Sequence, residues 1–440
     1  MAKILIVGGG YTGFYTALKL QKHLRRGEAE VTIVDPLPYM TYHPFLPEVA
    51  AGLIEARHVI VPLRRHLNKT HVVQGRVMNV NHAKKTATIQ PSAGKAYTVK
   101  YDHIVIAAGS VSRTFPIPGV AEEAYGMKSI EEALAVRDRI IDNFAKAANL
   151  PKGKERDRLL TVTVIGGGFA GIETFAELRS LASAMLSQYP ELTIEDTKFH
   201  MVEAMSRVMP EVSLRTSKWV LKNLASRQAT VHLDTQLKSA KGGKVELSNG
   251  LSFESDLIVW TAGVMANPVV RDMDLPLDDR GRMQSSTTLQ VTNNDGTVVA
   301  GAWAGGDNAA VPDLTGAGVG GMCVPNAQHA VRQAKLLAKN LVAVLRGENP
   351  VEYRHKNLGS VAGLGVGYGV FQSGKIAITG FPAWLMHRGY HGLAMPMWER
   401  KFRVVGGWIM QFLVGRDTTT LALRETPKSY FRAYASPSAK

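Results

Sequence analysis

Cysteine is nearly absent from this chain of 440 residues, in which Cys323 stands alone. A single cysteine excludes an internal disulfide framework and any cysteine pair able to pass electrons. Reduction of disulfides or of mercuric ions, and sulfide oxidation through a cysteine pair, are therefore excluded as activities. A lone cysteine is more often a small buried apolar side chain than a catalyst, and we expect this of Cys323.

Long apolar runs are also missing, since none reaches the roughly 18 residues that a helix needs to cross a bilayer. The first residues, Met1 to Gly10, lack the basic start, apolar core and small-residue cleavage site of a signal peptide. We therefore expect the chain to begin in the cytoplasm and not to cross a membrane. Disorder is expected only for the last few residues, Ser436 to Lys440.

Acidic residues are in deficit: 52 Lys and Arg face 37 Asp and Glu, for a formal net charge of +15. Nucleic acid, an anionic membrane surface and polyanionic cofactors would all suit this charge. The length fits two or three domains, and a hydrophobic content of 45% allows sizeable cores. Charge and length alone leave the partner open.

Glycine, in contrast, is plentiful, and its first cluster follows an apolar run at residues 4–7 that is typical of a buried strand. A helical pattern comes next, at residues 14–22, and a second predicted strand, 31–34, leads to an acid. Glycines in such a loop permit a tight turn and close approach to a pyrophosphate, and the acid accepts hydrogen bonds from a ribose. The predicted dinucleotide-binding residues, in G-x-G-x-x-G spacing with the acid, are Gly8, Gly10, Tyr11, Thr12, Gly13 and Asp35.

The whole unit recurs later in the chain. A strand is predicted at residues 162–165, a helix at 172–181 and a second strand at 199–202, which again leads to an acid. Two such units imply two dinucleotides, or the FAD and the nicotinamide of a flavoprotein. The corresponding loop and acid residues are Gly166, Gly168, Phe169, Ala170, Gly171 and Glu203.

The second acid bears on which nicotinamide binds. A carboxylate at the end of this strand suits the free 2′-hydroxyl of NADH and repels the 2′-phosphate of NADPH. Arg207, four residues after Glu203, would favour the phosphate instead. We expect NADH.

Each unit is followed by a strand that ends in a turn of small residues. After the first unit, three short strands are predicted between residues 72 and 100, and then a strand at 103–107. A similar strand at 257–260 follows the second unit. The small residues expected beside the cofactors are Ala108, Gly109, Ala262 and Gly263.

A last predicted strand, at residues 298–300, leads to Gly306 and Asp307, whose carboxylate can contact a sugar-alcohol chain such as the ribityl of FAD. Because this strand follows the second unit, the NADH domain must be inserted in the FAD domain. We therefore predict an α/β protein with two Rossmann-like dinucleotide-binding domains. The expected boundaries are 1–118 and 296–375 for the FAD domain, 119–295 for the NADH domain and 376–440 for a C-terminal amphipathic helical segment, with linkers near 115–119 and 294–297.

Together these residues resemble the two-dinucleotide flavoprotein superfamily that includes glutathione reductase, ferredoxin reductases and apoptosis-inducing factor. Within it the chain looks most like type II NADH dehydrogenase, a non-pumping NADH:quinone oxidoreductase. The likeness is carried by Tyr42 to Gly52, beside the FAD, by Gly168 to Glu173, in the NADH loop, and by Pro325 to Gln333, in the quinone-site helix. It implies FAD and NADH as cofactors and a membrane quinone, menaquinone or ubiquinone, as acceptor. No metal site is predicted.

The resemblance also implies roles for single residues. Glu173 would lie close to the nicotinamide and the flavin and help to relay a proton to the quinone. A glutamate in the first turn of a helix, however, is stabilised by the helix dipole without any such role. Gln328 would contact the quinone, and Arg332 stands where the family usually has a second glutamine.

Further cofactor contacts follow from the same segments. His43 and Ala327 would lie beside the FAD, and Pro325 predicts a helix that begins near Asn326. By resemblance, the N-terminus of this helix points at the flavin, where its dipole would stabilise the reduced anion. His43 and His329 are interpreted as packing or hydrogen-bonding residues that can titrate near neutral pH.

Aromatic residues concentrate after about residue 375. Residues 398–413 predict a helix with an apolar aromatic face and basic flanks, which is typical of a helix lying in a membrane interface. Packing of this face on the core or on a second subunit is the alternative. We expect a peripheral homodimer at an anionic membrane surface, on the cytoplasmic face of the cell membrane. The residues placed on the apolar face are Phe402, Val405, Trp408, Ile409 and Phe412.

Three functions are compatible with these patterns. The leading one is NADH:quinone oxidoreduction. The others are reduction of a soluble iron–sulfur protein and an NADH-sensing interaction role like that of apoptosis-inducing factor. The amphipathic C-terminal segment favours the quinone reductase, for which no nucleic-acid partner is expected.

Overall fold

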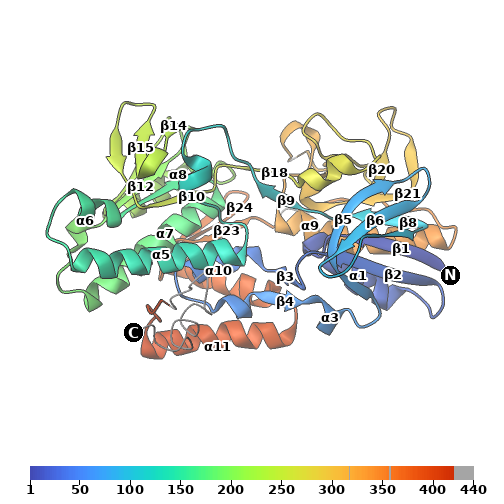
Figure 1. Cartoon of the computed structure of the whole chain (residues 1–440), viewed down its shortest axis with the longest axis horizontal. Helices are drawn as coiled ribbons and strands as arrows, with labels where there is room; N and C mark the ends of the chain where they lie inside the picture. The colour runs from blue at the N-terminus through green and yellow to red at the C-terminus, as the bar shows by residue number, and fades with distance from the viewer. Residues whose placement is uncertain (317, 356–357, 421–440) are drawn as a thin grey trace, which may run out of the picture.

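Two sheets, one in each half of the molecule, organise the chain (Figure 1). This computed structural model describes all residues except 317, 356–357 and 421–440, so the disorder expected for Ser436 to Lys440 lies outside the described residues. The two predicted strand–helix–strand units and the α/β class are confirmed.

The larger sheet has the strand order β20-β21-β8-β1-β2-β5-β6-β7. Its central strands, β21 to β5 in this order, run parallel, and the outer pairs are antiparallel. Strand β1 lies in the middle of the parallel region and is buried from Ile4 to Val7, as expected for a central strand of a parallel sheet. The bounds are β1 (Ala2–Val7), β2 (Ala29–Asp35), β5 (His71–Asn81), β6 (Thr86–Pro91), β7 (Tyr97–Lys100), β8 (His103–Ile106), β20 (Gln290–Thr292) and β21 (Val298–Ala304).

The smaller sheet is parallel throughout, with the order β10-β17-β11-β12-β13. A three-stranded antiparallel sheet, β14 to β16, belongs to the same half. The bounds are β10 (Ala124–Tyr125), β11 (Thr161–Ile165), β12 (Lys198–Val202), β13 (Ala229–His232), β14 (Leu237–Ser239), β15 (Lys244–Leu247), β16 (Ser252–Glu254) and β17 (Leu257–Trp260).

Small sheets of two or three short strands join and extend these halves. Strands β9 (Ser110–Ser112) and β18 (Val264–Ala266) form the ribbon by which the chain leaves and re-enters the larger-sheet half (Figure 1). The remaining strands are β3 (Tyr39–Thr41), β4 (Ile60–Pro62), β19 (Met283–Gln284), β22 (Ala309–Ala310), β23 (Ser360–Gly363), β24 (Gly369–Ser373) and β25 (Ile376–Thr379).

Two expected boundaries fall inside hairpins. The linker expected near residues 294–297 is the turn between β20 and β21, closed by a hydrogen bond from the Asn293 N–H to the Thr297 carbonyl. The boundary expected at 375/376 divides the hairpin of β24 and β25. Both segments are rich in Asn, Asp, Gly and Ser, which favour hairpin turns as much as linkers.

The helices cover the sheets and the base of the molecule. Helix α1 packs against α9, and α2 packs against both α5 and α7. Helix α11 lies along the base, next to α10 (Figure 1). The bounds are α1 (Tyr11–His23), α2 (Leu46–Ala50), α3 (Leu63–His66), α4 (Val120–Glu123), α5 (Ile130–Ala148), α6 (Lys154–Leu159), α7 (Phe169–Met185), α8 (Leu214–Ser226), α9 (Ala327–Leu345), α10 (Phe381–Ala394) and α11 (Trp398–Val414).

Local sequence signals explain where key helices begin. Ser129 caps α5 by accepting from the Glu132 N–H at 3.1 Å, while Glu132 accepts from the Ser129 N–H at 2.9 Å. The side chain of Asn326 caps α9 by accepting from the His329 N–H at 2.8 Å. The helix start expected near Asn326 is therefore confirmed.

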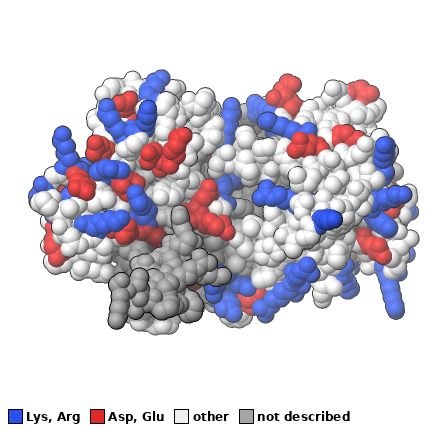
Figure 2. Space-filling model, viewed as in Figure 1, with Lys and Arg blue, Asp and Glu red and all other residues white. Residues whose placement is uncertain are grey.

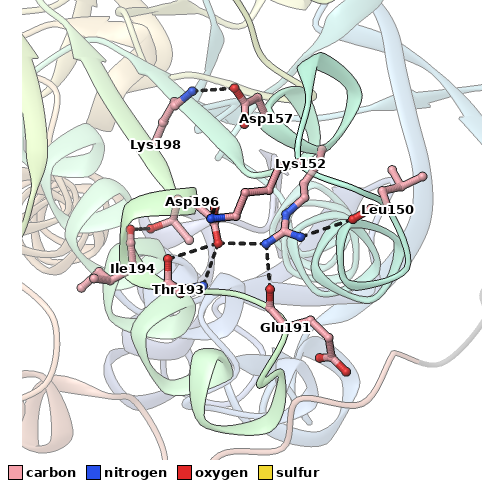
Figure 3. A network of polar contacts seen from close by, with 10 residues as sticks. Leu150, Lys152, Asp157, Glu191, Thr193, Ile194, Asp196 and Lys198 are labelled. Atoms are coloured by element: carbon pink, nitrogen blue, oxygen red, sulfur yellow. Dashed lines mark hydrogen bonds and ion pairs between the residues drawn. The ribbon is translucent and has the colours of Figure 1, made fainter.

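A polar network around the buried side chain of Arg156 braces the outer end of the smaller-sheet half (Figure 3). The Arg156 guanidinium donates to the Glu191 carbonyl at 2.7 Å and to the Asp196 carboxylate at 2.9 Å. It also donates to the Leu150 carbonyl at 3.3 Å. Because the network ties the α5–α6 connection to the segment before β12, its role is structural.

Cys323 is buried, as expected. Burial, followed by the nearby carboxylate of Asp313, raises the pKa of its thiol to about 11. The side chain is therefore a neutral thiol at physiological pH and not an activated nucleophile.

Candidate active site

One cleft of about 930 Å³ is shared by residues of the two sheet-bearing halves. This volume is near the upper end of the range for ligand pockets, which suits a ligand as long as a dinucleotide. The larger-sheet unit lines most of the cleft, and Phe169, Ala170 and Glu173 line it from α7. Among the predicted cofactor residues, those lining it from the larger-sheet unit are Gly8, Gly10, Tyr11, Thr12, Asp35, His43, Ala108, Gly109, Asp307 and Ala327.

The first glycine loop is built so tightly that two of its glycines are sterically required. Gly8 has φ +102°, and a Cβ there would lie 2.3 Å from the Ala107 oxygen. A Cβ on Gly13 would lie 1.8 Å from the Gly8 oxygen. Gly10 has open space around its Cβ position, which borders the cleft. Gly13 therefore shapes the loop, whereas Gly10 leaves room for a ligand.

Asp35 closes the other side of this loop. Its carboxylate accepts from the Gly9 N–H at 2.6 Å and from the Leu37 N–H at 2.7 Å. Burial raises its pKa, although both hydrogen bonds oppose that shift. The carboxylate is fixed at the end of β2, where it can accept from a ribose.

The opposite end of the cleft holds Asp307 and a cation from the other half. The Ser110 hydroxyl donates to the Asp307 carboxylate at 2.7 Å. Lys128, just before α5, donates to the Ser110 hydroxyl at 3.0 Å and lies 4.0 Å from Asp307. Gly306 holds the turn, with its N–H donating to Gln333 at 2.7 Å. Lys128 lines the cleft but has no signal in the sequence beyond its charge.

The second glycine loop repeats the first at the end of the smaller sheet. A Cβ on Gly171 would lie 1.9 Å from the Gly166 oxygen, and one on Gly168 would meet open space. Glu203 accepts from the Gly167 N–H at 2.5 Å and from the Met205 N–H at 2.7 Å. A Cβ on Gly166 would contact Ala262 at 2.9 Å, which places Ala262 and Gly263 beside this loop. These residues lie together but, apart from the start of α7, do not line the cleft.

Glu173 lies in the second turn of α7, because the helix begins at Phe169. The expectation of a glutamate in the first turn was wrong, and the helix dipole is weak at this position. Its carboxylate accepts from the Gly363 N–H at 3.0 Å and lies 3.2 Å from Nε2 of His387 on α10. The contacts with Gly363 and His387, and not the helix dipole, thus hold Glu173 at the cleft.

Aromatic and imidazole side chains line the cleft between these ends. The hydroxyl of Tyr11 is buried and has no hydrogen-bond partner among the described residues. Burial lowers the pKa of His43 to about 4, so its ring is neutral. The Tyr42 hydroxyl lies 3.0 Å from Nδ1 of His391. The unpaired hydroxyl of Tyr11 is therefore available to a bound ligand.

Gln328 and Arg332 lie outside the cleft lining. The Gln328 amide donates to the Gly359 carbonyl at 3.4 Å, and Arg332 donates to the Gln328 side chain at 3.4 Å. Arg332 also contacts His355 at 2.6 Å. Ala327 and Ala330 of the same helix do line the cleft. The structure thus brings Glu173 to the cleft without Gln328 or Arg332.

Sequence reasoning missed three residues around Glu173, namely Glu48, His387 and His391. The two histidines are four residues apart on α10, a spacing that places them on one helix face. This spacing of two histidines was visible in the sequence, but we interpreted the C-terminal segment that contains it only as membrane-associated.

Both signs of charge are mixed over the face drawn in Figure 2, with Lys and Arg prominent along the lower edge. Among the described residues, no helix is both long and apolar enough to cross a bilayer. The same residues contain no group of three His, Cys, Asp or Glu side chains placed to hold a metal ion.

Comparison with known proteins places these features in a family. The family model described as pyridine nucleotide-disulphide oxidoreductase matches residues 2–334. A "Probable NADH dehydrogenase" of Dictyostelium discoideum is 28% identical over 427 residues, which cover 95% of this chain and 91% of that protein. A "Type II NADH:quinone oxidoreductase Ndh" of Mycobacterium tuberculosis is 28% identical over 428 residues, or 94% and 89% of the two chains.

Among solved structures, NDH2 from Plasmodium falciparum in complex with NADH superposes with a TM-score of 0.86 at 18% identity. The match covers 95% of this chain and all of that one. At this identity the likeness establishes the shared fold.

Proposed function

The chain belongs to the pyridine nucleotide-disulphide oxidoreductase family, and on that premise we propose that it is an NADH:quinone oxidoreductase. It takes a hydride from NADH onto FAD and passes two electrons to a membrane quinone without pumping protons. The observation that carries this proposal is the shared cleft, in which the first glycine loop, Asp35 and Asp307 meet Glu173 of the second unit. Two relatives that each match over 90% of this chain are named NADH dehydrogenase and NADH:quinone oxidoreductase.

FAD fits the larger-sheet unit. Gly10 leaves space for the pyrophosphate, Asp35 is placed for the adenosine ribose, and Asp307 with Ser110 is placed for the ribityl chain. The Tyr11 hydroxyl, which is buried at the cleft without a hydrogen-bond partner in the described part of the chain, would supply a further polar contact. When bound, the flavin supplies the acceptor for the hydride, and the protein supplies position and electrostatics. We therefore assign the larger-sheet unit to FAD and the inserted smaller-sheet unit to NADH.

NADH rather than NADPH fits the second loop. Glu203 holds a carboxylate at the end of β12, where a 2′-phosphate would be repelled. Arg207, the residue able to reverse that preference, donates instead to the carbonyls of Val212 and Met209. The guanidinium is thus engaged within its own loop, which supports NADH.

The function is tested by anaerobic stopped-flow on the purified yellow protein. We expect fast bleaching of the flavin band by NADH, much slower bleaching by NADPH, and fast recovery with a menaquinone analogue. Bleaching without recovery would contradict the quinone assignment and favour a soluble iron–sulfur protein as acceptor. A long-lived flavin–nicotinamide charge-transfer complex with slow turnover would favour a sensing role.

The C-terminal helices support a membrane location. Phe402 is 73% exposed and Phe412 is 90% exposed on the outer side of α11. Exposed apolar residues of this kind seldom cluster on a monomer without a partner. Trp408 was expected on this outer face, but it packs inward and donates to Glu48 at 2.8 Å. We propose that the outer face of α10 and α11 lies in the interface of an anionic bilayer, on the cytoplasmic side of the cell membrane.

Changing both Phe402 and Phe412 to serine is expected to weaken binding to vesicles containing anionic lipid by at least about tenfold. Burial of one phenylalanine contributes on the order of 1.5–3 kcal/mol, and 1.4 kcal/mol corresponds to a factor of ten. Vesicle co-sedimentation measures the effect. Leu214→Ser, at a side chain 52% exposed on α8, is the matched control and should bind like the parent protein. Equal binding by the double variant would contradict the proposed membrane face.

The same outer face would also serve a homodimer, which we propose as the assembled state. Light scattering in detergent measures the molar mass of the particle and so shows whether the face binds a second subunit when no membrane is present. A dimer that persists in the double serine variant would place the contact between subunits elsewhere.

A further inference from the structure

A buried cluster of charged side chains lies directly behind Glu173, at the junction of α2, α7, α10 and α11. His387 is 3% exposed and Glu48 is 3% exposed, so water reaches neither freely. Charged side chains are seldom buried so completely unless they are paired. The charges of this cluster are paired with one another, and the function proposed above assigns the cluster no role.

The contacts form a continuous line from the cleft into the protein. Nε2 of His387 lies 3.2 Å from Oε1 of Glu173, which lines the cleft. On the other side of the ring, Nδ1 of His387 lies 4.0 Å from Oε1 of Glu48. The imidazole of His387 thus lies between two carboxylates and is closer to Glu173 than to Glu48.

The ring is held in this place by the elements around it. A Cβ on Gly363 of β23 would lie 3.2 Å from Cε1 of His387, so the ring packs closely against the backbone of β23. Glu48 is fixed by the indole N–H of Trp408 at 2.8 Å and lies 3.5 Å from the Arg388 guanidinium. That guanidinium stacks on Trp408, with 4.7 Å between its centre and the ring centroid.

The surroundings favour the charged imidazolium. Burial alone would lower the pKa of His387, but the carboxylates of Glu173, Glu48 and Glu177 outweigh burial and raise it. Burial and Glu48 in turn raise the pKa of Glu177, against the effect of Arg416 and Arg388. The charged and titratable groups that face His387 from the packed elements are Glu48 of α2, Glu173 and Glu177 of α7, Arg388 and His391 of α10, and Arg416 after α11.

The proton balance of the proposed reaction requires a proton donor in the protein. NADH gives up two electrons and one proton as a hydride, whereas a quinone takes two electrons and two protons to become a quinol. The C4–H bond of the nicotinamide breaks and two O–H bonds form on the quinone. The second proton must therefore come from the protein and ultimately from solvent.

We infer that His387 supplies this second proton by reloading Glu173, and that Glu48 is the positioning residue that keeps His387 oriented for the transfer. This inference rests on the proposed function. His387 Nε2 gives its proton to Oε1 of Glu173 as Glu173 gives its own to the quinone oxygen. The proton that His387 loses is replaced from solvent before the next turnover, so that each quinol formed consumes one solvent proton.

The test compares three steps in the full-length flavoprotein by anaerobic stopped-flow. These are bleaching by NADH, recovery with a menaquinone analogue, and recovery with ferricyanide, which accepts electrons without protons. The variants are His387→Gln and Glu48→Gln. The matched control is His82→Gln, because His82 is also buried, but its ring nitrogens contact Tyr101 and Ala300 and neither Glu173 nor Glu48.

For His387→Gln we expect recovery with the quinone to slow by at least about tenfold, since proton transfer by a positioned side chain is typically worth more than that. Bleaching by NADH and recovery with ferricyanide should stay within about twofold. In the parent protein, recovery with the quinone should fall as the pH rises through the raised pKa of His387, because the proton donor is then lost. The variant should lack this pH step.

Glu48→Gln keeps an acceptor for the Trp408 N–H but removes one charge that raises the pKa of His387. We expect it to move the pH step to lower pH, which a purely structural role would not do. Unchanged quinone recovery in His387→Gln, or equal slowing with ferricyanide, would overturn the inference. A parent protein that NADH does not bleach or that the quinone does not reoxidise would instead refute the proposed function.

Discussion

Replacing Glu173 with glutamine is expected to slow quinone reduction on the order of 100-fold while flavin bleaching by NADH stays within about twofold. General acid catalysis by a positioned side chain contributes about 10²–10⁴-fold, and an amide cannot carry the proton. Glutamine keeps the acceptor oxygen for the Gly363 N–H, which is 3.0 Å away, so the fold of this region should survive. Hydride transfer to the flavin requires no protein acid, which is why the first half-reaction should be unaffected.

The measurement is the rate of flavin recovery with a quinone after stoichiometric reduction by NADH. Glu155→Gln is the control, because Glu155 is an exposed glutamate in the first turn of α6 in the same half of the molecule. If Glu173→Gln slowed bleaching as strongly as recovery, the carboxylate would act in nucleotide binding and not in proton transfer. Normal recovery in the variant would leave Glu173 a structural side chain that holds Gly363.

The glycine loops and the acids after them could be predicted because their causes are local. A glycine at position 13 is dictated by a contact only five residues away, with the Gly8 oxygen. The strand, loop and helix around it follow from short-range patterns of apolar residues. The same holds for the cap of α9 at Asn326.

The cluster behind Glu173 could not be predicted because its parts come from distant segments. Glu48 and Trp408 are 360 residues apart, yet the indole N–H donates to the carboxylate at 2.8 Å. A helical pattern alone gave Trp408 an outward position, because apolar spacing does not distinguish the face that meets the core from the one that meets a membrane. Lys128 was missed because its partner Ser110 belongs to β9 of the ribbon between the two halves, so the contact depends on how the halves are arranged.

Arg332 illustrates a third limit. Its place in the motif suggested a contact with the acceptor, but the guanidinium lies against Gln328 and His355 on the side of α9 away from Ala327 and Ala330, the residues that line the cleft. Helical periodicity explains this difference, because residues two and five positions apart point in different directions. The motif gives the order of the side chains along α9, but the helical geometry determines which of them line the cleft.

Gly13→Ala is expected to give a protein without bound flavin and with a lower melting temperature even as apoprotein. The added methyl would lie 1.8 Å from the Gly8 oxygen, so the backbone of the first loop must separate from the start of α1. Overpacking of this kind costs about 1–3 kcal/mol or more. Gly10→Ala is the informative partner, because its methyl meets nothing within 4 Å and its φ of −69° suits alanine.

Gly10→Ala should therefore keep the melting temperature of the apoprotein but still lose flavin, since its methyl would occupy the space left for the pyrophosphate. The ratio of flavin to protein absorbance and the apoprotein melting temperature together separate the two effects. Full flavin content in Gly10→Ala would place the pyrophosphate elsewhere in the cleft. An unchanged melting temperature in Gly13→Ala would mean that the first loop relaxes without cost, and the tight contact between Gly8 and Gly13 would then not be what holds the FAD site in shape.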